Sequence, residues 1–178
     1  LRDLAIRTSM PTWLVRRWAD VRGTPDTRAL LHRLNERPQY AVHTLDVTPD
    51  DLDALDVAWT PSLYVPDMVR VETLQPLVQA GWLNDGRVVV QGEGAALIVD
   101  LLDPEPGDVV LDLCAAPGTK TLYAARKMQG RGVLWANDRN AQRTAMIDEV
   151  LSRHPHTGHV TTHTADARSI TPDDLPES

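Results

Sequence analysis

The sequence contains little cysteine and no long apolar run. Its single cysteine, Cys114, excludes an internal disulfide and is typical of a protein in the reducing cytoplasm. No apolar run approaches the ~18 residues that a membrane span requires, and the start of the sequence has no signal-peptide pattern. We therefore expect a cytoplasmic protein with no membrane partner. Because the first residue is Leu1 and not methionine, we also expect a longer natural chain.

Basic residues are also scarce relative to acidic ones, and the net charge of −7 argues against a uniformly basic nucleic-acid-binding protein. The charge is uneven along the chain. Residues 1–40 carry eight arginines against four acidic residues, a net +4, whereas residues 41–178 carry 10 basic and 21 acidic residues, a net −11. The basic front end is compatible with an anionic ligand, and equally with an ordinary solvated pair of helices.

At 178 residues, 42% of them hydrophobic, the chain is long enough for one ordinary domain or two small ones. Start signals that contain proline predict two helices in a first segment, residues 1–38. Alternating residues at 40–45 and a weaker strand at 68–71, with a capped helix between them, predict a small α+β module over residues 39–84. The third segment, residues 85–178, follows a different pattern.

In this third segment, strand-like runs alternate with helix-like runs. Strands are expected at 88–90, 109–113, 133–136 and 159–163, and helices at 95–102, 119–129 and 140–151. The run at 109–113 is apolar, which is typical of a parallel strand covered on both faces. Alternating strands and helices at this spacing predict half of a Rossmann-like parallel sheet. The expected fold class is therefore α/β, with a partial Rossmann-like sheet preceded by the small α+β module.

The most informative stretch is residues 112–121, Asp-Leu-Cys-Ala-Ala-Pro-Gly-Thr-Lys-Thr. It lies between a predicted strand and a predicted helix, where α/β sheets bind cofactors. Its spacing does not match the phosphate loop of nucleotide triphosphatases, and Cys114 and Ala116 occupy the first two glycine positions of the dinucleotide signature. A nucleoside with less phosphate, such as S-adenosylmethionine, therefore fits this loop better.

Acidic residues follow three successive predicted strands, at Asp112, Asp138 and Asp166. A carboxylate at position 138 would accept hydrogen bonds from both hydroxyls of a ribose, and one at position 166 would meet an adenine amino group. Each residue taken alone is also compatible with an ordinary turn or loop aspartate. The three together favour a cofactor site.

For the other residues that could take part in chemistry, the sequence favours structural roles. Cys114 lies beside a helix N-terminus, which would favour a nucleophilic thiolate, but packing against the cofactor is the preferred interpretation. The histidines show no metal-ligand spacing, so we expect no metal site, and His154 and His156 are expected as a surface pair. Trp13 and Trp18 would serve as base-stacking platforms or as packing residues, and their helical spacing favours packing.

Residues 112–121 resemble the S-adenosylmethionine motif of RNA cytosine-5 methyltransferases of the NOL/NOP/Sun family, with the bacterial Fmu-like rRNA enzymes most similar. The motif is specific, because Cys-Ala-Ala-Pro-Gly-x-Lys-Thr is rare outside this family. The similarity extends over most of the chain. Further stretches that resemble the family lie at 10–18, 35–38, 90–93, 138–143 and 166–168.

The resemblance implies an S-adenosylmethionine methyltransferase sheet preceded by an RNA-binding module. It also implies cofactor-binding roles for Cys114, Ala115, Ala116, Pro117, Gly118, Thr119, Lys120, Asp138, Arg143 and Asp166. Lys120 would in addition face the methyl-transfer centre as an auxiliary group. Gly92, Ala95 and Thr119 depart from the family's usual acidic residue, serine and glycine. Thr119 is tolerated if its backbone avoids positive φ.

By the same resemblance, we expect a monomeric enzyme whose partner is RNA, with small-subunit rRNA favoured over tRNA. In this family a thiolate attacks C6 of cytosine, the methyl group passes to C5, and a second cysteine assists release. Both cysteines belong to motifs downstream of this sequence. We therefore expect no catalytic nucleophile within these residues and no activity from them alone.

Three alternatives stay open at this point. One is a cytosine-5 methyltransferase that acts on tRNA. Another is a non-catalytic RNA-binding protein with a vestigial cofactor fold. The last is a nucleotide-dependent oxidoreductase, which the glycine spacing disfavours.

Overall fold

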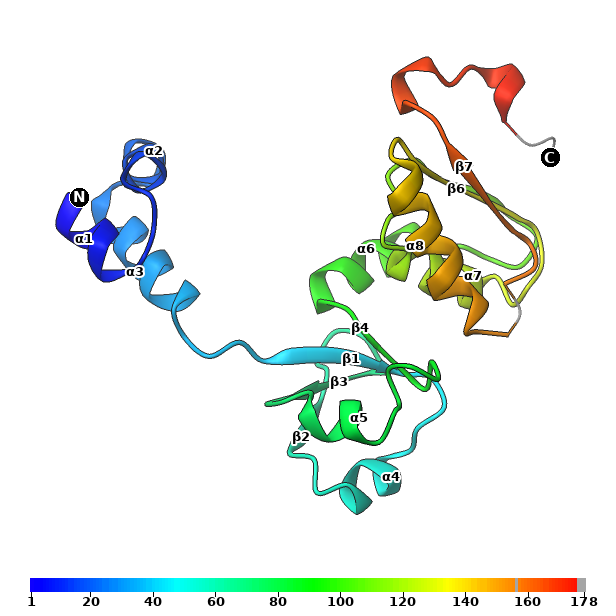
Figure 1. Cartoon of the computed structure of the whole chain (residues 1–178), viewed down its shortest axis with the longest axis horizontal. Helices are drawn as coiled ribbons and strands as arrows, with labels where there is room; N and C mark the ends of the chain where they lie inside the picture. Colours follow the sequence, from blue (N-terminus) through cyan, green and yellow to red (C-terminus); the bar gives the residue numbers. More distant parts are fainter. Residues whose placement is uncertain (156, 176–178) are drawn as a thin grey trace. The chain divides into compact units, whose positions relative to one another are not determined.

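A computed structural model of the protein describes residues 1–155 and 157–175, and Figure 1 shows its path. The chain divides into two compact units, Leu1–Pro38 and Gln39–Ser178. None of the helices described is long and apolar enough to cross a membrane.

The first unit consists of three helices, of which the sequence predicted two. They are α1 (Arg2–Arg7), α2 (Thr12–Arg22) and α3 (Thr24–Leu34). Helix α1 was not predicted from the sequence, because no capping side chain marks its start. A small core holds the helices together, centred on Ala5, Val15 and Leu31.

The two tryptophans of α2 differ in their surroundings. Trp18 packs against the core of the first unit, as its spacing predicted. Trp13 is 65% exposed and lies outside this core, so packing of this residue at an interface stays a prediction. The two residues are five apart, and five residues at 100° per residue place them on different faces of a helix.

The second unit begins with an antiparallel sheet in the order β2-β3-β1-β4. Its strands are β1 (Tyr40–Thr44), β2 (Trp59–Pro61), β3 (Met68–Val71) and β4 (Val88–Val90). Two helices accompany the sheet, α4 (Pro49–Ala54) and α5 (Gln75–Gln79). Thr48 and Asp51 form a reciprocal capping box that fixes the start of α4. The sequence grouped 88–90 with the following segment, but β4 pairs with β1 and completes this first sheet.

The rest of the second unit is a parallel sheet in the order β5-β6-β7. Its strands are β5 (Val109–Asp112), β6 (Val133–Asp138) and β7 (Val160–Thr164). The accompanying helices are α6 (Glu93–Leu102), α7 (Thr119–Lys127) and α8 (Ala141–Ser152), followed by short 3₁₀ turns at Ala167–Ser169 and Pro172–Asp174. The alternation of strands and helices confirms the predicted partial Rossmann-like fold.

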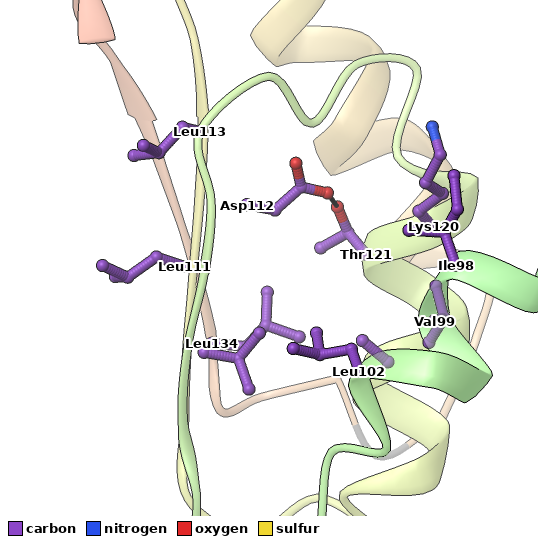
Figure 2. A pocket seen from close by; sticks show the side chains of 11 residues that line it. Ile98, Val99, Leu102, Leu111, Asp112, Leu113, Lys120, Thr121 and Leu134 are labelled. Carbon is purple, nitrogen blue, oxygen red and sulfur yellow. Dashed lines mark hydrogen bonds between the residues drawn. The ribbon is translucent and has the colours of Figure 1, made fainter. Parts of the chain in front are cut away.

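Strand β5 is less covered than its apolar sequence predicted. Val109, Leu111 and Leu113 are about 40% exposed, at 42%, 39% and 39%. Leu111 and Leu113 point away from α6 and α7, whereas Asp112 points toward Thr121 of α7 (Figure 2). The three exposed residues alternate and share one face of the strand, and their exposure shows that the prediction of two covered faces is wrong here.

A buried polar contact joins the antiparallel sheet to α7. His43 on β1 is 2% exposed, and its Nε2 lies 2.7 Å from Oε1 of Gln91. The His43 ring also packs on the ring of Tyr123 in α7, with centroids 4.5 Å apart. Tyr123 in turn donates a hydrogen bond to Asp100 of α6. Apolar residues from both sheets surround this contact and form one core cluster.

Two histidines of the second unit are buried in the neutral form. Burial lowers the pKa of His43 below its ordinary value, against smaller opposing effects of Gln91 and Asp67. Burial also lowers the pKa of His154, which is 8% exposed, and the charges of Arg126 and Arg153 lower it further. The predicted surface position of His154 is therefore wrong, while His156 lies outside the described residues.

These two histidines predict a loss of stability in mild acid. The unfolded chain takes up protons near pH 6.5, whereas the folded chain resists them, so the unfolded state binds more protons. Stability is fully present above this pH and falls as the pH drops through it. Urea unfolding should therefore show a lower midpoint at about pH 5.5 than at about pH 7.5. An equally steep fall in the double variant His43→Gln/His154→Gln would contradict this assignment.

Gly118 provides a second stability test. It has φ of +105°, and a Cβ at this position would lie 3.1 Å from Cα of Ile147 in α8. Gly118→Ala should therefore lower the free energy of unfolding by about 1–3 kcal/mol. The matched control is Gly94→Ala inside α6, where a Cβ meets nothing within 4 Å. This substitution should raise the free energy of unfolding by about 0.5–1 kcal/mol, because alanine has the higher helix propensity. Thermal unfolding of both variants gives the comparison, and equal effects would refute the argument.

Candidate cofactor site

The loop between β5 and α7 forms the centre of the candidate site. Gly118, in a left-handed conformation, directly precedes the first residue of α7. The N–H of Ala115 donates to the carbonyl of Asn137 at 2.8 Å, and the N–H of Gly118 donates to Ala115 at 2.8 Å. Thr119 adopts helical backbone without positive φ, so the expectation that it replaces a glycine without strain is confirmed.

Asp112 connects the end of β5 to the first turn of α7. Its Oδ2 accepts a 2.8 Å hydrogen bond from the hydroxyl of Thr121, and its Oδ1 accepts a longer bond of 3.4 Å from the N–H of Cys114. Because both oxygens bond within the loop and helix, Asp112 fixes the shape of the turn. Cys114 itself is exposed at the surface of this loop.

Asp138, at the end of β6, is almost wholly buried beside the same loop. Its side chain is 4% exposed and forms an ion pair with Arg143, with 3.5 Å between Nη1 and Oδ2. The N–H of Asn140 donates to its other oxygen at 3.1 Å. Arg143 also donates to the carbonyl of Ala116 at 3.1 Å, so one guanidinium bridges the loop and Asp138. A carboxylate has about four acceptor positions, and the contacts with Arg143 and Asn140 use two of them.

Asp166 follows β7 and caps the 3₁₀ turn at Ala167–Ser169. Arg168 donates to both carboxylate oxygens, with distances of 3.0 Å from Nε and 2.6 Å from Nη2, and its backbone N–H donates at 3.0 Å. These hydrogen bonds lower the pKa of Asp166 to about 2, the guanidinium contributing most. The carboxylate is therefore ionised at neutral pH and acts as an acceptor.

Asn137, on β6 beside Asp138, is a residue of the candidate site that was not predicted from the sequence. It is fully buried, and its side-chain amide bonds to the backbone of Leu113 and of Ala165, which lie just beyond β5 and β7. A polar residue at the end of a buried strand was the available signal, because such a residue requires hydrogen-bond partners.

An apolar groove of about 290 Å³ lies beside the loop, between β5, α6 and α7. Asp112 and Lys120 lie among its lining residues, together with apolar side chains such as Leu102 and Leu134 (Figure 2). Lys120 is exposed, and its amine points away from the sheet in this view.

The structure thus brings most of the predicted cofactor residues to one edge of the parallel sheet. Direct contacts join the loop at 114–118, Asp138 and Arg143. Asp166 reaches the same edge through the neighbouring strand, while Lys120 borders the groove instead. Across residues 1–155 and 157–175, no group of three histidine, cysteine or acidic residues could hold a metal ion.

Comparison with known proteins relates this arrangement to a family of methyltransferases. Residues 99–176 match the family model described as 16S rRNA methyltransferase RsmB/F. The chain is 30% identical over 158 residues to the probable ribosomal RNA small subunit methyltransferase B of Bacillus subtilis, which covers 86% of this chain. It is 42% identical over 71 residues, 39% of this chain, to the 26S rRNA (cytosine-C(5))-methyltransferase nsun-5 of Caenorhabditis elegans.

A solved structure gives the same result for the fold. The crystal structure of PH0851 superimposes with a TM-score of 0.81 at 26% identity, over 94% of this chain and 39% of the other. The chain spans 35% of the Bacillus relative and 16% of the Caenorhabditis relative. The site, the family model and these relatives agree: residues 99–176 match the RsmB/F methyltransferase model, and the chain is similar to rRNA methyltransferases of the NOL/NOP/Sun type.

Proposed function

We propose that this chain is the cofactor-holding part of an S-adenosylmethionine-dependent RNA cytosine-5 methyltransferase that acts on small-subunit rRNA. One observation carries the proposal: the loop at 114–118, Asp138 and Asp166 stand at the carboxyl ends of three adjacent parallel strands. This edge is where open α/β sheets bind nucleosides. The names of the relatives supply the reaction type and the rRNA substrate.

In this proposal, different residues of the chain bind different parts of the cofactor. Asp138 accepts hydrogen bonds from the ribose hydroxyls, and Asp166 accepts from the adenine amino group, for which its ionised state is suited. The small residues Ala115, Ala116 and Gly118 let the backbone of the loop approach the ligand, with Cys114, Pro117 and Thr119 beside them. Arg143 holds the loop against Asp138.

S-adenosylmethionine, when bound, supplies the methyl group for C5 of cytosine. Lys120, at the start of α7, is the proposed auxiliary group for methyl transfer. Cys114 packs against the cofactor in this proposal, since it lies in the loop that holds it. The thiolate that attacks cytosine therefore has to come from a different residue.

RNA is the proposed macromolecular partner, bound by a monomer in the cytoplasm. The arginine-rich segment 1–38 offers positive charge to the phosphate backbone. Strands β1, β2 and β3 lie in the proposed RNA-binding module at 39–84, whereas β4 of the same sheet follows the boundary at residue 84, which stays a prediction. The rRNA substrate is favoured over tRNA because the relatives with the longest matches are named for ribosomal RNA.

Substitution of Asp138 tests the cofactor assignment. A charge-assisted hydrogen bond contributes about 1.5–3 kcal/mol, so Asp138→Ala should weaken S-adenosylmethionine binding roughly 10- to 150-fold. Isothermal titration calorimetry measures the affinity of this chain and its variant. The control is Asp50→Ala, in the first turn of α4, which should bind like the original. A loss of less than about twofold for Asp138→Ala would refute the assignment.

Ligand choice separates the proposal from its alternatives. A methyltransferase site should bind S-adenosylmethionine and leave NAD unbound, because the loop lacks the glycine pattern that cradles a pyrophosphate. Both ligands can be titrated against the same protein sample. Preference for NAD would indicate an oxidoreductase. Binding of RNA without either ligand would favour a non-catalytic RNA-binding protein.

A further inference from the structure

The side chain of Asn137 joins the ends of all three parallel strands. It lies in β6, and its Nδ2 donates to the carbonyl of Leu113 at 3.1 Å and to the carbonyl of Ala165 at 3.0 Å. Its Oδ1 accepts from the N–H of Ala165 at 3.0 Å. The Asn137 carbonyl also accepts from the N–H of Ala115 at 2.8 Å. Leu113 and Ala115 belong to the loop after β5, and Ala165 directly precedes Asp166.

These contacts begin where the regular strand pairing stops. The last paired residues of β5 and β7 are Asp112 and Thr164. Leu113 and Ala165 each lie one residue further on, so backbone pairing no longer fixes the distance between the two loops. The Asn137 amide replaces the missing ladder bonds and holds both loops to the end of β6.

We propose that Asn137 is a positioning residue of the cofactor site, which sets the spacing between the loop at 114–118, Asp138 and Asp166. The inference rests on the proposed S-adenosylmethionine site and deepens it. A site of this kind must be held within about 0.5 Å of its productive geometry, and a displacement of about 1 Å can cost a hundredfold. In this proposal Asn137 acts through its hydrogen bonds to the backbone of the two loops.

The chemistry of the amide suits this role better than that of other side chains of its size. Its two N–H donors meet two carbonyls, and its oxygen meets one N–H. Leucine has the same branched shape but leaves all three backbone groups unpaired in a fully buried position. An ionised aspartate accepts the N–H of Ala165 but presents an oxygen to carbonyl oxygens. A protonated aspartic acid regains one donor.

The first experiment measures the loops without any ligand. Hydrogen exchange is measured on the whole chain. The amides around 113–118 and at Ala165 should exchange at least about tenfold faster in Asn137→Leu than in the original protein. Amides in the antiparallel sheet should keep their protection. The control is Leu52→Ala, which removes buried volume from the other core and should leave the two loops protected. Uniform loss of protection in Asn137→Leu would overturn the proposal, since the residue would then serve general stability.

The second experiment uses Asn137→Asp and S-adenosylmethionine titrations between about pH 8 and about pH 5.5. Burial beside two carbonyl oxygens raises the pKa of such a carboxyl, so it becomes a neutral donor as the pH falls. Binding by Asn137→Asp should therefore improve at least about tenfold relative to the original protein over this range, while Asn137→Leu stays weak throughout. A general structural role would give no such rescue, and a flat ratio for Asn137→Asp would overturn the proposal.

The two experiments separate failure of this inference from failure of the proposed function. If the original chain binds no S-adenosylmethionine, the proposed cofactor is wrong, and hydrogen exchange alone then decides whether Asn137 holds the two loops. If the original binds and Asn137→Leu binds equally well, the cofactor assignment stands and the positioning role of Asn137 is refuted.

Discussion

Parallel pairing of β5, β6 and β7 in a single register is the constraint on which the rest of the candidate site depends. It aligns Asp112 with Ala136 and Asp138 with Thr164, so the three chain segments leave the sheet at one edge. Residues 24 and 26 positions apart along the chain thereby become neighbours. The polar contacts between different segments at the site, such as those of Arg143 with the loop and of Asn137 with the neighbouring strand ends, depend on this alignment.

Polar contacts in the second unit follow a common physical pattern. Groups that folding removes from water are bonded where geometry allows, as at Asn137, and held neutral where charge would be costly, as at His43. His43 and Tyr123 connect the antiparallel sheet to α7, the helix that begins at the cofactor loop. The small sheet and the candidate site therefore share one packed core.

Periodicity was sufficient to predict most elements after residue 39, because alternating and helical patterns are local properties of the chain. The same holds for Asp138 and Asp166, whose positions follow from the ends of predicted strands. Two sequence-based predictions were wrong because they concerned contacts between distant segments. Val88–Val90 has the composition of a strand, but composition does not say which sheet it joins. The apolar run of β5 indicated burial, but exposure depends on which segments pack over it.

The sequence alone determined the family resemblance, the strand–loop–helix at 112–121 and the acidic residues at the strand ends. Each of these depends on short runs of consecutive residues. Tertiary structure decided the contacts between those residues. Arg143 could be named from its motif, but only folding places its guanidinium against both Ala116 and Asp138. Asn137 belongs to no motif that was recognised, and its importance arises from three backbone groups that the parallel sheet brings within hydrogen-bonding distance. Hydrogen bonds between distant segments depend on the folded arrangement, and a local pattern cannot specify them.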